Sequence, residues 1–401
     1  MSARAAGAPL RVLVLGHGAE RTGPPVYLVR VGRWLREHTD VQLEVVLMDG
    51  GPLLPDIEQL GPVTVLPEFG LQGRARYLPA LGKRLGGERL AQAGRALALR
   101  SAARGIGEAD VVWVNTAGSI RALRYLPHRP PRVLTQVHEL SLGLERHLRL
   151  EDRDLIEAST DRYVTVSRPV TAHLVERWGI APERIGHAAG VVDLPVPPVG
   201  RPLAEVRERI GARPGDLVVG TAGTVDWRKA PDLFLALAHE LDRRVDRRIV
   251  LVWLGGGPSS PAWDWALEMR TAAGLDDRVT FVGEQDDPLD WMRAFDLFVL
   301  PSREDAFPLV CLEAASVGVP VICFDSGGIG DFVAPEGEPP AGAVVPFPDL
   351  AAMADACTAL LLDDALRRRA GALARDRVAE RHAVEVGARA LLHELQLVAR
   401  G

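Results

Sequence analysis

The sequence contains few cysteines, very few lysines and no long apolar run. Its 401 residues include three cysteines, Cys311, Cys323 and Cys357, all in apolar stretches and too few for a disulfide framework or a zinc ribbon. No apolar run approaches the roughly 18 residues of a membrane-spanning helix, so we expect a soluble, cytoplasmic protein. A net charge of −6 argues against general binding of nucleic acid.

The composition indicates a folded chain of more than one domain. Hydrophobic residues make up 47% and charged residues 25% of the sequence, which is the balance of a protein with a buried core. At roughly 150 residues per domain, the length suggests about two or three domains. The basic residues are almost all arginine, and the only lysines are Lys83 and Lys229. A lysine in so arginine-rich a chain is a candidate functional residue.

Short β-branched runs alternate with longer helical patterns, which is typical of parallel α/β domains. Because each strand run is apolar on both faces, we expect helices on both sides of a sheet. The strands expected in the first half are Val12–Leu15, Leu43–Met48, Val63–Leu66, Val111–Asn115, Val133–His138 and Arg162–Ser167. The helices expected between them are Val26–Glu37, Leu81–Arg104, Leu144–Ala158 and Pro169–Trp178.

A proline-rich stretch at residues 194–200 interrupts this pattern and is typical of a stiff linker. The alternation then resumes with the expected strands Leu217–Thr221, Ile249–Leu254, Val279–Val282, Leu297–Leu300 and Val321–Phe324. The pattern predicts a first domain over residues 1–193, a linker over 194–203, a second domain over 204–383, and a last helix over about 384–401 that packs back on the first domain. Two doubly wound sheets facing each other would form a cleft at the carboxyl ends of their strands.

The segment from residue 297 to residue 320 carries the strongest candidate site. A buried strand ends at Pro301, a polar loop follows, and a helix opens near Pro308. The amides of Leu309 and Val310 at the helix start lack intrahelical partners and lie at the positive end of the helix dipole. The sequence therefore predicts an anion site at this helix start.

Glu313 lies inside the same helix among apolar residues, so we expect its carboxylate to be buried. A buried carboxylate is costly without a partner. It can accept hydrogen bonds from two vicinal hydroxyls of a ribose or sugar, or it can pair with a buried arginine, and the spacing leaves both open.

The stretch from Asp305 to Glu313 resembles the E-x7-E signature of the retaining glycosyltransferases of family 4. That family has the GT-B fold, in which two Rossmann-like, doubly wound parallel-sheet domains face each other across a cleft. The resemblance implies that Glu313 holds the nucleotide ribose and that Asp305, where the family has glutamate, lies near the transferred sugar. It also implies that the donor binds at Phe307, Pro308, Leu309 and Val310, where the backbone amides around the helix start at Pro308 face donor oxygens. The turn Gly327–Asp331 resembles the glycine-rich turn that follows in the family.

The segment Gly223–Pro231 resembles the family's G-R-x-x-x-x-K-G segment. Lys229 falls on the lysine that contacts the departing diphosphate, Thr224 stands where the family has arginine, and Arg228 is our candidate substitute for that cation. Fixed cations are needed because the diphosphate gains charge as the glycosidic bond breaks. A solvated loop lysine is the alternative interpretation of Lys229. Gly283 ends a stretch that resembles the family's base-binding loop.

Two features of the first half are candidate parts of the same site. Gly18 and Gly23 belong to a loop after the first strand that resembles the family's loop over the donor phosphate and acceptor. An ordinary strand-to-helix turn is the alternative. His138 ends a strand and should lie at the cleft mouth, where the family often has a histidine beside the transferred sugar. A structural histidine is the alternative there.

Two other motifs are assigned to the protein surface. Asp152-Arg153-Asp154 spells the D-x-D metal motif of another glycosyltransferase architecture, but it lies within a predicted helix, so we expect a solvated face. The run Arg367-Arg368-Arg369 is also expected on a helix surface, and contact with anionic lipid at the inner membrane face is the alternative.

The resemblance implies a hexosyltransferase that moves a sugar from a nucleoside-diphosphate sugar to an acceptor hydroxyl with retention of configuration. The implied setting is glycan, glycolipid or glycosylated-metabolite biosynthesis, and His138, Lys229 and Asp305 would be the catalytic residues. We expect no metal and no cofactor besides the donor, and the acceptor is a glycan, a lipid or a small molecule that the sequence does not specify.

Two other classes of protein stay open. A nucleotide-sugar-binding protein without turnover is suggested by Thr224 and Asp305, which depart from the family pattern. A Rossmann NAD-dependent enzyme is suggested by Gly16-x-Gly18, although a lone G-x-G is weak evidence.

Overall fold

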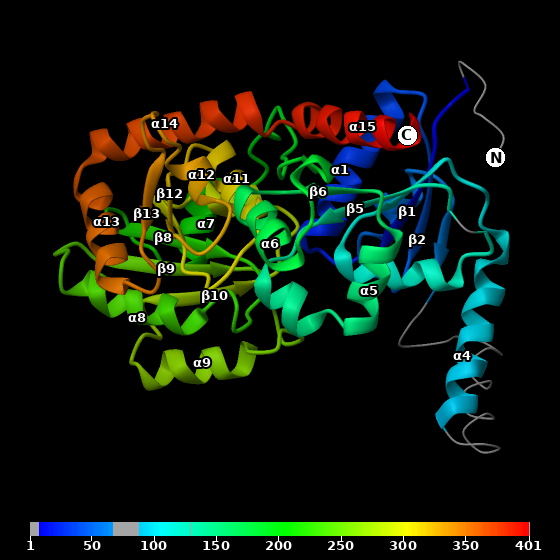
Figure 1. The fold of residues 1–401 in the computed structure, drawn as a ribbon. Helices are drawn as coiled ribbons and strands as arrows, with labels where there is room; N and C mark the ends of the chain where they lie inside the picture. The colour runs from blue at the N-terminus through cyan, green and yellow to red at the C-terminus, as the bar shows by residue number, and fades with distance from the viewer. Residues whose placement is uncertain (1–7, 67–87, 129, 401) are drawn as a thin grey trace. The chain divides into compact units, whose positions relative to one another are not determined.

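The computed structural model describes residues 8–66, 88–128 and 130–400 (Figure 1). The chain forms two compact units. Unit 1 comprises Met1–Ala189 and Val384–Gly401, and unit 2 comprises Gly190–Ala383. The chain therefore passes from one unit to the other twice, between residues 189 and 190 and between residues 383 and 384. Within the described ranges, no helix is both long and apolar enough to cross a membrane.

Unit 1 is built on a seven-stranded sheet in the order β3-β2-β1-β4-β5-β6-β7, with every neighbouring pair parallel. Its strands are β1 (Arg11–Gly16), β2 (Gln42–Leu47), β3 (Val63–Val65), β4 (Val111–Val114), β5 (Val133–Val137), β6 (Arg162–Thr165) and β7 (Ile185–His187). Its helices are α1 (Gly23–His38), α2 (Leu54–Glu58), α4 (Glu88–Ala102), η2 (Ala103–Gly105), η3 (Ala117–Tyr125), η4 (Leu142–His147), α5 (Leu150–Ser159), α6 (Arg168–Trp178), η5 (Pro182–Arg184) and α15 (Val384–Arg400).

Unit 2 repeats this plan with a six-stranded parallel sheet in the order β10-β9-β8-β11-β12-β13. Its strands are β8 (Leu217–Ala222), β9 (Ile249–Leu254), β10 (Val279–Gly283), β11 (Leu297–Leu300), β12 (Val321–Phe324) and β13 (Gly342–Val345). Its helices are α7 (Leu203–Arg209), α8 (Pro231–Asp242), α9 (Trp263–Ala272), α10 (Pro288–Met292), α11 (Leu309–Ser316), α12 (Gly330–Val333), α13 (Leu350–Leu362) and α14 (Asp364–Arg381).

The central strands are buried on both faces, as their apolar sequences predict. All residues of β8 and β9 are buried, and the core of unit 2 includes the fully buried rings of Phe234 and Trp253. In each sheet the strand order reverses beside the first strand, since β1 lies between β2 and β4 and β8 lies between β9 and β11. Loops diverge at such a point, and this is where ligands bind in open parallel sheets.

The last helix, α15, is part of unit 1 and packs against α1 and the central strands (Figure 1). Its buried face includes Leu391 and Leu395, both fully buried. Burying each leucine contributes about 1.5–3 kcal/mol. The amphipathic spacing of this helix therefore anchors the C-terminal segment to unit 1.

Several elements differ from the sequence predictions. The short edge strands β7 and β13 were not predicted, and neither were the short helices α2, α7 and α12. The helix predicted over Leu144–Ala158 is wrong as one element, because a π-helical segment, η4, ends at His147 and α5 begins at Leu150. The helix predicted over Leu81–Arg104 lies partly outside the described residues, and α4 covers the rest of it.

The proline-rich stretch lies in unit 2 and is held against α10. The amides of Gly200 and Arg201 donate to Oδ2 of Asp290, at 2.9 and 2.6 Å. The Arg293 side chain donates to the carbonyl oxygen of Pro197 at 2.6 Å. These bonds fix the segment to α10 and the residue that follows it, within unit 2.

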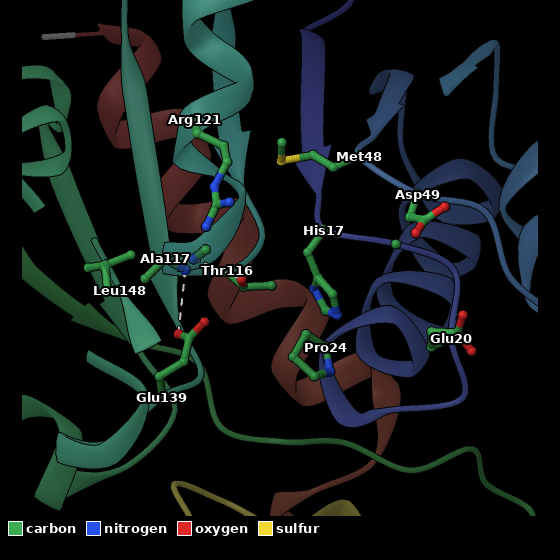
Figure 2. Close-up of a pocket in the computed structure, with 13 residues that line it drawn as sticks. His17, Glu20, Pro24, Met48, Asp49, Thr116, Ala117, Arg121, Glu139 and Leu148 are labelled. Carbon is green, nitrogen blue, oxygen red and sulfur yellow. Dashed lines mark hydrogen bonds between the residues drawn. The ribbon is translucent and has the colours of Figure 1, made fainter. Parts of the chain in front are cut away.

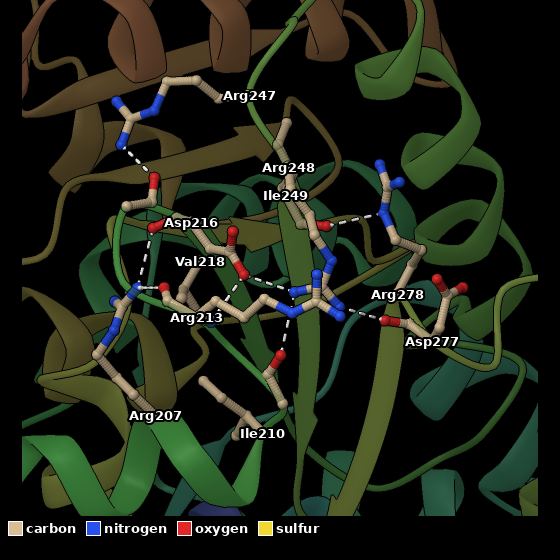
Figure 3. Close-up of polar contacts among 12 residues, drawn as sticks. Arg207, Ile210, Arg213, Asp216, Val218, Arg247, Arg248, Ile249, Asp277 and Arg278 are labelled. Atoms are coloured by element: carbon tan, nitrogen blue, oxygen red, sulfur yellow. Dashed lines mark hydrogen bonds and ion pairs between the residues drawn. The ribbon is translucent and has the colours of Figure 1, made fainter.

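An arginine-rich network ties together the amino ends of β8, β9 and β10, at the edge of the sheet opposite the candidate site (Figure 3). Its centre is Asp216, whose carboxylate accepts from the Arg213 amide at 2.7 Å and the Arg248 side chain at 2.5 Å. Burial raises the pKa of Asp216, but the Arg213 amide and the Arg248 guanidinium outweigh it and hold that pKa below its usual value.

We expect Asp216→Asn to lower the free energy of unfolding by about 2 kcal/mol, because the charge-assisted bond to Arg248 is lost. The pKa of Asp216 is lower in the folded protein than in the unfolded chain, so this stability is present above the unfolded pKa of about 3.9. It is lost as the pH falls through the folded pKa. Thermal melts at pH 7 and near pH 3 measure it. Asp277→Asn is the matched control, because Arg248 bonds the backbone carbonyl oxygen of Asp277, which the substitution keeps. Equal melting temperatures for the two variants at pH 7 would contradict the assignment.

Candidate functional site

Lys229 is a buried lysine at the carboxyl edge of the unit 2 sheet. It lies in the loop between β8 and α8, and only 8% of its surface is exposed. Its ammonium Nζ donates to Oδ2 of Asp305 at 2.6 Å, and its backbone amide donates to Oδ1 of Asp226 at 2.8 Å. The alternative that Lys229 is a solvated loop lysine is therefore wrong.

The carboxylate of Asp305 is shared by two cations. Besides Lys229, the Nη1 atom of Arg228 donates to its Oδ2 at 3.0 Å. Burial raises the pKa of Asp305, but the charges of Lys229 and Arg228 outweigh it and hold that pKa below its usual value. The Asp305 carboxylate is therefore ionised at neutral pH, and it accepts hydrogen bonds from two basic side chains.

Glycines allow the three loops of this cluster to approach one another. A Cβ atom at Gly223 would lie 3.0 Å from Cε of Lys229, so the lysine stem packs directly over that backbone. A Cβ atom at Gly327 would overlap the carbonyl oxygen of Asp305, and the Gly328 amide donates to the same oxygen at 3.1 Å. The glycine-rich turn after β12 is therefore needed for close packing against Asp305.

The start of α11 lies directly after the loop that carries Asp305. Pro308 is the residue that precedes the helix, so α11 begins one position later than predicted, and Leu309 and Val310 lie in its first turn. The first amides of a helix have no intrahelical acceptor and carry the positive end of its dipole. Asp305 and this helix start therefore belong to one connected stretch of chain, and the two cations come from the loop between β8 and α8.

Two further predicted site residues lie on the same helix and loop. Glu313 is half-buried rather than buried, so the expectation of a fully buried carboxylate is wrong. Phe307 is half-buried, and its ring packs against His382 with the ring centroids 5.4 Å apart. Leu312, Ala314 and Ala315 are buried, which confirms that α11 is an interior helix.

Thr224 and Gly283 also lie at the carboxyl edge of the unit 2 sheet. Thr224 follows β8 and is half-buried. Gly283 ends β10 with φ +79°, and its carbonyl oxygen accepts from the Gly255 amide at 2.8 Å. The structure thus brings Lys229, Arg228 and Asp305 into direct contact and places Thr224 and Gly283 at the carboxyl ends of β8 and β10, on either side of β9.

Unit 1 contains a pocket of about 450 Å³ at the carboxyl edge of its own sheet (Figure 2). The loops after β1 and β2 form one side, and the start of η3 forms the other. The lining residues are His17, Gly18, Glu20, Pro24, Met48, Asp49, Thr116, Ala117, Gly118, Arg121, Glu139, Gly143 and Leu148. Its volume falls in the range of small-molecule sites, about 300–1,000 Å³.

The predicted residues of unit 1 have different positions around this pocket. Gly18 lines it, whereas Gly23 is the first residue of α1 and His138 is not among the lining residues. The ring of His138 packs edge-on against Tyr27 at 5.2 Å. Burial, together with the nearby His17, lowers the pKa of His138 to about 3, so this imidazole is neutral at physiological pH.

The prediction that the D-x-D stretch is a solvated face is wrong for Asp152. Its side chain is fully buried and pairs with Arg124 at 2.6 Å and with Arg121 at 3.4 Å. Both arginines come from η3, so this carboxylate joins α5 to the helix beside the pocket. A local pattern could not reveal partners 28 and 31 residues away.

Comparisons with known proteins agree with this architecture. Residues 204–377 match the family described as glycosyl transferases group 1. The lipopolysaccharide core biosynthesis mannosyltransferase LpsB of Rhizobium meliloti is 36% identical over 189 residues, which cover 47% of this chain and 53% of that protein. D-inositol 3-phosphate glycosyltransferase 1 of Catenulispora acidiphila is 29% identical, with 82% of each chain covered.

The chain spans about half the length of most of the curated relatives that it matches. Among solved structures, Alr3699/HepE of Anabaena in complex with UDP has a TM-score of 0.74 at 19% identity, covering 96% of this chain and 100% of that chain. At that identity the likeness shows the fold. The predicted GT-B fold is thereby confirmed, and residues 204–377 form a glycosyltransferase domain of group 1.

Proposed function

We propose that the whole chain transfers a sugar from a nucleoside-diphosphate sugar to an acceptor hydroxyl, with retention at the anomeric carbon. The observation that carries the proposal is the buried Lys229–Asp305–Arg228 cluster beside the start of α11. Such a cluster supplies fixed positive charge where a diphosphate leaves. The glycosyltransferase domain supports the donor class, and solved neighbours of the same fold hold UDP or UDP-glucose.

In this proposal, different groups of unit 2 bind different parts of the donor. Lys229, with the amides of Leu309 and Val310, stabilises the diphosphate, and the carboxylate of Glu313 accepts hydrogen bonds from the ribose hydroxyls. Asp305 orients Lys229 and lies near the transferred sugar. We expect no metal, because the lysine, the arginine and the helix start supply the positive charge.

The proposed transfer needs no protein nucleophile. The bond between the anomeric carbon and the β-phosphate oxygen breaks, and the acceptor oxygen bonds to the same face of that carbon. The acceptor's proton passes to the leaving phosphate oxygen, so that the products are the glycoside and a nucleoside diphosphate. The protein contributes by holding the acceptor hydroxyl beside the leaving oxygen on the same face of the anomeric carbon and by stabilising the charge that grows on the diphosphate.

A nucleotide-sugar-binding protein without turnover is the second candidate, and Thr224 in place of the family's arginine is the observation that favours it. A panel of UDP-, GDP- and ADP-sugars assayed for hydrolysis and for transfer to a mixed acceptor set separates the two. Turnover of one donor supports the transferase. Tight binding of a donor with neither hydrolysis nor transfer supports the second candidate, and preferential binding of NAD would exclude both.

We expect Gly190→Ala to weaken binding of the nucleoside diphosphate about tenfold, which is about 1.4 kcal/mol. A Cβ at this position would lie 2.6 Å from Cδ2 of Leu309 and 2.7 Å from Cδ1 of Phe307, so the start of α11 must shift. The carbonyl oxygen of Gly190 is also bonded to Nδ1 of His382 at 2.9 Å. Calorimetric titration measures the change. Gly105→Ala is the control, because a Cβ there would meet no atom within 4 Å; equal dissociation constants for both variants would refute the prediction.

A further inference from the structure

Most of the charged residues that line the unit 1 pocket, within the described part of the chain, are acidic. Three carboxylates line it, from Glu20, Asp49 and Glu139, against one arginine, Arg121. Burial lowers the pKa of His17, so this imidazole is uncharged at neutral pH and adds no positive charge. A ligand in this pocket therefore meets more negative than positive groups.

The charge of Arg121 is already opposed within the protein. Its Nε atom lies 3.4 Å from Oδ2 of Asp152, a carboxylate with no exposed surface. Because Asp152 is buried, solvent screens this pair only weakly. Arg121 therefore shares an internal anion with Arg124, which weakens its attraction for a second anion.

The side chains around the pocket suit hydroxyl groups and a carbon ring. Oε2 of Glu139 accepts from the amides of His138 and Ala117, at 2.9 and 3.4 Å, which fixes the carboxylate at the start of η3. Burial raises the pKa of Glu139, and the hydrogen bonds from Thr116 and from these amides offset part of that rise. Carboxylate oxygens accept hydrogen bonds, and hydroxyl groups are suitable donors. Pro24 and Leu148 add apolar surface beside these polar groups.

We propose that this pocket is the acceptor site and that it takes an uncharged polyol, a sugar or cyclitol without a phosphate group. This inference rests on the proposed function and names the class of its acceptor. Hydroxyls of such a ligand donate to the carboxylates of Asp49 and Glu139, and its ring packs on the apolar lining. A phosphate dianion would instead lie among like charges, which disfavours binding.

The test compares pairs of acceptors that differ only by phosphate: myo-inositol with D-inositol 3-phosphate, and mannose with mannose 6-phosphate. With the donor found in the panel, we expect kcat/KM for the uncharged member of a pair to exceed that of the phosphorylated member at least tenfold. Ligand-observed NMR without donor should likewise show binding of the uncharged member alone. Preference for the phosphorylated member in either measurement overturns the inference.

Charge reversal at the pocket provides a second, independent arm. Asp49→Lys should reduce the preference for the uncharged member at least tenfold. Glu176→Lys makes an equal change of charge at an exposed position of α6 and should leave that preference unchanged. The same ratio in both variants overturns the inference. If the donor is hydrolysed but neither kind of acceptor binds, the pocket assignment fails while the donor site stands. If no donor is bound or turned over, the proposed function fails, and the NMR comparison still decides the ligand class.

Discussion

Replacing Lys229 with methionine is expected to lower the rate of glycosyl transfer about 10²–10³-fold, which is the usual effect of removing one fixed group that stabilises developing negative charge. The ammonium is buried and held 2.6 Å from Asp305, so its position is set before the donor binds. Methionine retains the unbranched stem of the side chain and removes the charged, hydrogen-bonding Nζ atom. Steady-state kinetics with the donor found in the panel measures the loss.

The fold of the variant should survive, because Asp305 keeps its second cation, Arg228, at 3.0 Å. A melting temperature within a few degrees of the wild type would show this. Arg368→Met, at an exposed position of α14, removes the same charge as a control and should leave transfer unchanged. Wild-type kinetics in Lys229→Met would show that Lys229 does not take part in transfer.

The second large effect is expected for Glu313→Gln, which should lower kcat/KM for the donor about 10–100-fold. This corresponds to about 1.5–3 kcal/mol, the contribution of hydrogen bonds to a charged group. Glu313 lies in the second turn of α11 and is half-buried, so a ligand at the helix start could reach it. We expect the change mainly in KM, because the ribose is bound equally in the ground state and the transition state.

A donor without the 2′- and 3′-hydroxyls gives this prediction a specific control. If Glu313 binds the ribose, the wild type should lose as much kcat/KM with the dideoxy donor as the variant loses with the natural one. The variant should show no further loss with the dideoxy donor. Additive losses would mean that Glu313 acts elsewhere, for example on a partner within the protein.

Much of the fold could be predicted because its strands are buried on both faces. The predicted Ile249–Leu254 and Leu297–Leu300 coincide with β9 and β11, whose apolar runs cannot lie at a surface. The edge strands β7 and β13 are short and partly exposed, so their residues lack that signal. The helical pattern also led to the wrong prediction that Asp152 is solvated. Periodicity alone does not show that Arg121 and Arg124 pack over this residue.

The candidate site was accessible to sequence reasoning only in part. The scarcity of lysine and the loop spacing pointed to Lys229, and the family resemblance pointed to Asp305, 76 residues away. The unit 1 pocket was largely missed, because its lining comes from separate loops after β1, β2, β4 and β5. The loop with Gly18 was the part of its lining that the resemblance indicated, and the position of Glu139 directly after a buried strand was a further available signal.

Calorimetric titration of UDP, GDP and ADP into the wild type and into Lys229→Met tests the central claim most directly. The account predicts that at least one of these nucleotides binds the wild type and that its dissociation constant rises at least tenfold in the variant, about 1.4 kcal/mol or more. Equal dissociation constants in the two proteins, or no binding of any nucleoside diphosphate to the wild type, would contradict it.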